Sequence, residues 1–73
     1  MNALGKIVLI GVGLIGGSLM LDLKRRQQAG TVVGIDINAD NLARALERRV
    51  IDEAHTEITV DNIAQADLVI LAT

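Results

Sequence analysis

Four glycines stand within the seven residues 11–17, in the stretch GVGLIGGSLM, where an apolar run gives way to an amphipathic pattern. Glycine loses more conformational freedom on folding than any other residue, and inside a helix it costs roughly 0.5–1 kcal/mol relative to alanine. Glycines concentrated at such a junction therefore indicate a turn in which the backbone bends tightly or closely approaches another group.

Strands and helices alternate around this junction. Continuous apolar runs rich in Ile and Val are typical of strands buried on both faces, and predict strands at residues 6–11, 31–36 and 67–73, with a very short one near 56–59. Apolar residues at helical spacing predict helices at residues 14–28 and 38–49 and a short helical turn near 61–66. Gly30 is expected to end the first of these helices.

The helix predicted at residues 38–49 has defined ends and faces. Asn38 is a preferred N-cap residue, and Asp40 in the first turn complements the positive end of the helix dipole. The side chains expected to face the core are Leu42, Ala45 and Leu46, and those expected to face water are Arg44, Glu47 and Arg48.

This alternation predicts an α/β fold built from right-handed βαβ units on a parallel sheet. The strand order expected is 3-2-1-4, the first half of a Rossmann-type doubly wound sheet. In that order the fourth strand lies beside the first, on the side away from the second. The reversal creates a ligand crevice at the carboxyl ends of the first and fourth strands.

The glycines match the G-x-G-x-x-G pattern of dinucleotide-binding turns. Gly11 permits the tight turn, Gly13 lets the backbone approach a pyrophosphate, and Gly16 lets the helix pack closely on the strand. Asp36 closes the second predicted strand twenty residues after Gly16, where a carboxylate accepts hydrogen bonds from the adenosine ribose. The alternative is that the glycines only make a tight turn and that Asp36 only caps a loop.

The predicted cofactor is NAD, with NADP less favoured. The Asp36 carboxylate repels a 2′-phosphate, and Ile37 and Asn38 supply no cation for one, so only Arg44 or Arg48 reaching back would reverse this preference. FAD and S-adenosylmethionine sites share parts of the pattern and remain alternatives. The residues predicted to line the cofactor are Gly11, Val12, Gly13, Leu14, Ile15, Gly16, Gly17, Ser18, Asp36, Ile37, Ala72 and Thr73.

Composition argues against several other functions. The sequence has no aromatic residue for stacking on bases, and its net charge of −2 disfavours broad binding to nucleic acid or acidic membranes. It has no cysteine and no apolar run of membrane-spanning length, so we expect a soluble, cytoplasmic protein. His55 is interpreted as a surface loop residue, and the acidic residues Asp52, Glu53 and Glu57 as a solvated turn without a metal.

The stretch KIVLIGVGLIGGSLMLDLKRRQQAGTVVGIDIN, with its G-x-G-L-I-G-G-S run, resembles the prephenate and arogenate dehydrogenases. The segments VIDEAHTEI and ADLVILAT are also similar to this family, so the resemblance covers residues 6–73. Arg49 departs from the family pattern, which has glycine before V-I-D.

The resemblance implies a tyrosine-biosynthesis enzyme that oxidises prephenate or arogenate with decarboxylation and passes hydride to NAD(P)+. It also implies a homodimer. The family's catalytic histidine and substrate-binding arginine would fall after Thr73, so no residue of this chain is expected to be catalytic. We therefore interpret residues 1–73 as part of a dinucleotide-binding domain, inactive alone and with an open apolar edge at its fourth strand.

Two other functions remain possible at this point. A nucleotide-sensing module uses the same half-site without catalysis, and other β-hydroxyacid-type dehydrogenases share parts of both motifs.

Overall fold

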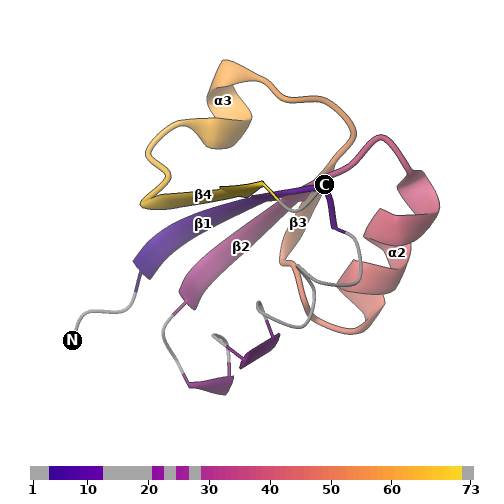
Figure 1. Cartoon of the computed structure of the whole chain (residues 1–73), viewed down its shortest axis with the longest axis horizontal. Coiled ribbons are helices and arrows are strands. Elements are labelled where there is room, and N and C mark those ends of the chain that lie inside the picture. The colour runs from indigo at the N-terminus through magenta and orange to yellow at the C-terminus, as the bar shows by residue number, and fades with distance from the viewer. Residues whose placement is uncertain (1–3, 13–20, 23–24, 27–28, 72–73) are drawn as a thin grey trace.

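A computed structural model of the chain describes residues 4–12, 21–22, 25–26 and 29–71. Within these residues the fold is a parallel sheet of strand order β3-β2-β1-β4, seen side by side in Figure 1. The strands are β1 (Leu4–Ile10), β2 (Ala29–Ile35), β3 (Glu53–His55) and β4 (Leu68–Leu71). The predicted α/β class and the 3-2-1-4 order are confirmed.

The register brings all four carboxyl ends to one line. Ile10 pairs with Ile35 on one side and with Leu71 on the other, and Ile35 pairs with His55. Residues that follow the strands therefore emerge at a common edge. The chain steps outward from β1 to β3 and then returns to the other side of β1, which places the topological switch at β1.

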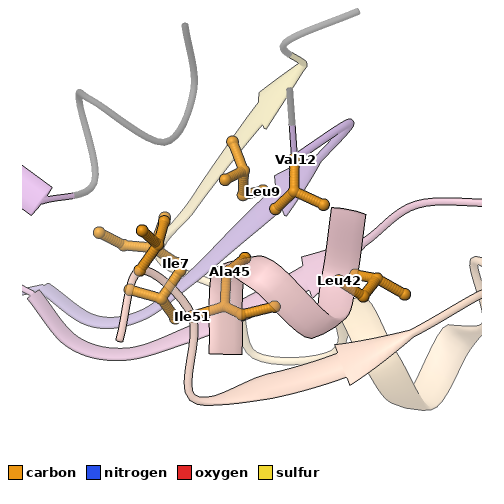
Figure 2. Close-up of a cluster of buried hydrophobic side chains, with 8 residues drawn as sticks. Ile7, Leu9, Val12, Leu42, Ala45 and Ile51 are labelled. Atoms are coloured by element: carbon orange, nitrogen blue, oxygen red, sulfur yellow. The ribbon is translucent and has the colours of Figure 1, made fainter. Parts of the chain in front are cut away.

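Alternating side chains of the strands form two buried clusters, one on each face of the sheet. Ile7, Leu9 and Val32 belong to the first cluster, which Leu42 and Ala45 of α2 (Ala39–Glu47) complete (Figure 2). The second cluster is smaller and consists of Val8, Val33 and Ile35, with Ile10 and Ala66 packed against it.

Helix α2 begins as its sequence predicts. The Asn38 side chain accepts hydrogen bonds from the backbone N–H groups of Asp40 at 2.9 Å and Asn41 at 3.1 Å. Leu42 and Ala45 are buried, whereas Leu46 is 42% exposed, so the predicted burial of Leu46 is wrong. Leu46 instead lines a groove on the surface.

Arg49, which stands where the family pattern has glycine, lies at the C-terminal end of α2. Arg49 adopts φ 61° and donates its N–H to the Leu46 carbonyl at 3.0 Å, while Val50 donates to the Ala45 carbonyl at 2.8 Å. This pair of bonds is a Schellman motif, in which the left-handed position is usually glycine. Arginine therefore occupies the site where the family pattern predicts glycine.

Two boundaries differ from those predicted. Gly30 lies inside β2 and does not end a helix, because the parallel ladder with β1 already begins at Ala29. The short third strand is Glu53–His55 rather than residues near 56–59, because it aligns with the buried residues 33–35 of β2.

The helices at the two other predicted positions are covered to different extents. Most of the helix predicted at 14–28 lies outside the described residues, although Leu21, Asp22 and Arg25 are helical. The helical turn predicted near 61–66 is α3 (Val60–Ile63), with Thr59 as its N-cap. Among the residues that the structure describes, no helix has the length and apolarity needed to cross a bilayer.

Candidate functional site

The candidate site lies at the edge where the strands end, and Gly11 is its first residue after β1. Gly11 adopts φ 86°, a left-handed conformation that side chains disfavour, and its N–H donates to the Ile35 carbonyl at 2.8 Å. This bond extends the ladder by one residue while the chain turns. The tight turn predicted at Gly11 is therefore confirmed.

Asp36 is the first residue after β2, and its carboxylate joins three segments. Oδ2 accepts the N–H of Val12 at 3.1 Å and the side-chain Nδ2 of Asn41 at 3.4 Å, and Oδ1 accepts the N–H of Asn38 at 2.9 Å. The backbone N–H of Asp36 donates to the His55 carbonyl at 3.1 Å. The carboxylate is thus held beside the start of the glycine turn, partly buried, by donors of this chain.

Ile37 follows Asp36 and is 93% exposed. A large aliphatic side chain gains nothing from this position in the described part of the molecule. Its exposed apolar side chain therefore follows directly on the residue whose carboxylate is held at this edge.

Gly34 lies in β2, and its missing side chain leaves room for residues that pack next to the site. The sequence patterns did not indicate this role. A Cβ on Gly34 would lie 2.7 Å from Cδ1 of Ile51 and 3.2 Å from Cγ1 of Val12. The absent side chain lets the buried Ile51 and the turn residue Val12 pack on the same spot of β2. Gly34 therefore couples the core to the glycine turn.

Eight of the predicted site residues lie outside the described residues, so their positions stay predictions. They are Gly13, Leu14, Ile15, Gly16, Gly17, Ser18, Ala72 and Thr73. The four that are described, Gly11, Val12, Asp36 and Ile37, gather at one edge of the sheet.

His55 is not in a loop, as the sequence had indicated, but is the last residue of β3. Its ring lies half-buried with Nε2 3.0 Å from Oε2 of Glu53. Asp52 lies exposed in a bend just before β3, as predicted, and its carboxylate accepts the N–H of Val32 in β2 at 2.8 Å. Across the described ranges, no three acidic, histidine or cysteine side chains are placed to share a metal ion.

A shallow groove of about 610 Å³ lies beside the C-terminal end of α2. Its lining residues come from the first helical segment, the last turn of α2 and the segment between α2 and β3, and are Leu21, Arg25, Leu46, Arg49, Ile51 and Asp52. None of these residues belongs to the row of strand ends that holds Gly11 and Asp36.

Comparisons with known proteins agree on one group of relatives. A family model described as "Prephenate dehydrogenase, nucleotide-binding domain" matches residues 19–73. The prephenate dehydrogenase of Bacillus subtilis (strain 168) is 37% identical over 67 residues, which make up 92% of this chain and 18% of that protein.

A solved structure is similar over the whole chain. It is a crystal structure of prephenate dehydrogenase from A. aeolicus in complex with hydroxyphenyl propionate and NAD+, with a TM-score of 0.83 and 32% identity. The match covers 100% of this chain and 24% of that one. The chain therefore spans about a quarter or less of the length of these relatives.

Proposed function

Because the chain belongs to the prephenate dehydrogenase family, with its match in the nucleotide-binding domain, we propose that it binds NAD+ across the carboxyl ends of β1 and β2. The glycine turn receives the pyrophosphate, and Asp36 receives the adenosine ribose. Ile37 lies against the adenine ring. Gly13, Gly16, Gly17 and Ser18 border the phosphates, and Ala72 and Thr73 border the nicotinamide half.

The observation that carries this proposal is the bond between Val12 N–H and Asp36. It holds a carboxylate against the turn that would cradle the phosphates. Such a carboxylate accepts ribose hydroxyls without further ordering, which lowers the entropic cost of binding.

The surroundings of Asp36 favour NAD+ over NADP+. A free helix N-terminus attracts phosphate, but the N-terminus of α2 is already capped by the Asn38 side chain. Asp36 and Asp40 both add negative charge near the place where a 2′-phosphate would lie. The exposed cations Arg44 and Arg48 lie further along the chain, in α2 and at its C-cap.

For the intact protein we infer the reaction of its family. Prephenate or arogenate loses its carboxylate as CO2 while hydride passes to NAD+, which supplies the oxidising power. The histidine and arginine that act on substrate would lie after Thr73, in a cytoplasmic homodimer of tyrosine biosynthesis. In this proposal residues 1–73 are the first half of the Rossmann domain and do not turn over substrate alone.

Titration of NADH into the 73-residue chain tests cofactor binding. The chain has no aromatic residue, so the fluorescence of the cofactor is observed against almost no background. We expect saturable binding that NADPH and S-adenosylmethionine compete for poorly. Gly13→Val and Asp36→Ala should weaken it, while Asp61→Ala, an acidic residue of α3, should not.

Folding of each variant is checked by circular dichroism. The proposal would be contradicted if the folded 73-residue chain and a chain extended beyond Thr73 both fail to bind NADH at millimolar concentration. NADH binding by an intact protein that does not oxidise prephenate or arogenate would favour a nucleotide sensor instead.

A further inference from the structure

Asn41 lies in the first turn of α2 and points its side chain back to Asp36. The side chain is half-buried, and its Nδ2 donates to Oδ2 of Asp36 at 3.4 Å. Its backbone N–H donates to the Asn38 cap side chain. Among the described residues, the hydrogen-bond partner of its side chain is Asp36.

The three donors divide the acceptor positions of Asp36 unequally. An ionised carboxylate offers about four lone-pair positions, two on each oxygen. From the described residues, Oδ2 receives two donors, Val12 and Asn41, whereas Oδ1 receives one, Asn38. With these donors counted, the position left for a ligand hydroxyl is on Oδ1.

We propose that Asn41 is a positioning residue for nucleotide binding, which occupies Oδ2 of Asp36 so that the ribose binds through Oδ1. This inference rests on the proposed function. Without the Asn41 amide, Oδ2 keeps a single backbone donor, and the carboxylate gains freedom to rotate and to bind water. A ribose hydroxyl then has to order the carboxylate when it binds.

A leucine variant tests this role because leucine has nearly the shape of asparagine and no donor. Asn41→Leu should weaken NADH binding about threefold to tenfold, since the lost bond is long and neutral on the donor side. Asn41→Asp should weaken NADH binding further, because two carboxylates would then face each other. Added salt screens this repulsion, so it should reduce the difference in NADH affinity between the aspartate and leucine variants.

Asn62 provides a matched control. It occupies the same position in α3 that Asn41 occupies in α2: its N–H bonds to the cap side chain of Thr59 at 3.1 Å. Its Nδ2 donates to the Glu57 carbonyl at 2.8 Å, away from the candidate site. Asn62→Leu should leave NADH affinity within twofold of the parent chain.

The decisive measurement is a double-mutant cycle with Asp36→Ala. A positioning residue acts through its partner, so Asn41→Leu should change NADH affinity less than twofold in the Asp36→Ala chain. As a second readout, Asn41→Leu should weaken binding of ADP but not of 2′,3′-dideoxy-ADP, which lacks the ribose hydroxyls.

The outcomes separate this inference from the proposed function. If the parent chain binds NADH and Asn41→Leu binds equally well, only the role of Asn41 is overturned. An equal loss with and without Asp36, or an equal loss for both ADP ligands, also overturns it. If neither the folded parent nor a chain extended beyond Thr73 binds NADH or ADP, both the proposed function and this inference fail.

Discussion

The backbone N–H of Val12 donates to Oδ2 of Asp36 at 3.1 Å, across 24 residues of sequence. The second residue after β1 and the first residue after β2 are thus tied together where both strands end. The bond also stabilises the fold, because the same carboxylate that would bind ribose holds the turn after β1 against the end of β2.

Asp36→Ala should therefore lower stability as well as cofactor affinity. The change removes the acceptor of three hydrogen bonds, two of them from backbone N–H groups, and we expect the free energy of unfolding to fall by about 1–3 kcal/mol. Urea denaturation followed by circular dichroism, without cofactor, measures this. Asp40→Ala, an exposed neighbour, should cost less than 1 kcal/mol; equal losses for the two variants would contradict a structural role for Asp36.

Gly34→Ala should be destabilising because the space beside Gly34 is filled. The added Cβ would meet Cδ1 of Ile51 at 2.7 Å and Cγ2 at 2.8 Å, and we expect a loss of about 1–3 kcal/mol in the free energy of unfolding. In an Ile51→Ala chain, which is itself less stable, the same change should cost much less. Additive losses in that cycle, measured by urea denaturation, would refute the steric explanation.

The features that follow local patterns could be predicted from the sequence. Three such features are the order of the strands, the cap at Asn38 and the place of Asp36 at the end of β2. All three depend on short apolar runs and on the polar and glycine residues that bound them. Alternating strands and helices favour right-handed βαβ connections on a parallel sheet, and the 3-2-1-4 order is that of the Rossmann-type arrangement.

Other features depend on contacts between distant residues, which patterns do not reveal. β3 has only three residues, and its sequence EAH lacks an apolar run, so its position follows from pairing with β2. The role of Gly34 depends on Ile51, and the occupancy of Oδ2 of Asp36 depends on Asn41 in the next helix. The sequence predicts a loop at His55 for the same reason, because the strand there depends on pairing with β2.

Asp67 joins the start of β4 to β1 in a way that can be tested. Its carboxylate accepts the N–H groups of Gly5 at 2.7 Å and Lys6 at 3.0 Å. Asp67→Ala should lower the free energy of unfolding by about 1–2 kcal/mol, because both donors lose a charged acceptor. Asp61→Ala is the control. If urea denaturation shows that Asp67→Ala lowers the free energy of unfolding no more than the control does, the two bonds to Asp67 do not stabilise the fold.

Arg49→Gly should stabilise the chain. Arg49 holds φ 61° at the end of α2, where glycine has no steric penalty, and we expect a gain of about 0.5–1 kcal/mol in the free energy of unfolding. Arg48→Gly, at a position without positive φ, should be neutral or destabilising. A decrease in the melting temperature of Arg49→Gly would mean that the contacts of the arginine side chain outweigh the backbone strain.

β4 ends the described sheet with an apolar surface, and this edge should make the 73-residue chain self-associate. Leu68, Val69 and Leu71 are 39%, 47% and 73% exposed, and an edge strand of this kind pairs readily with another chain. Leu71→Lys places a charge on the edge, so the average mass from light scattering should fall toward that of the monomer at a given concentration. Leu46→Lys, which adds the same charge on α2 away from β4, should leave the mass unchanged. A parent chain that stays monomeric at high concentration, or an equal effect of both lysines, would mean that the β4 edge does not drive association.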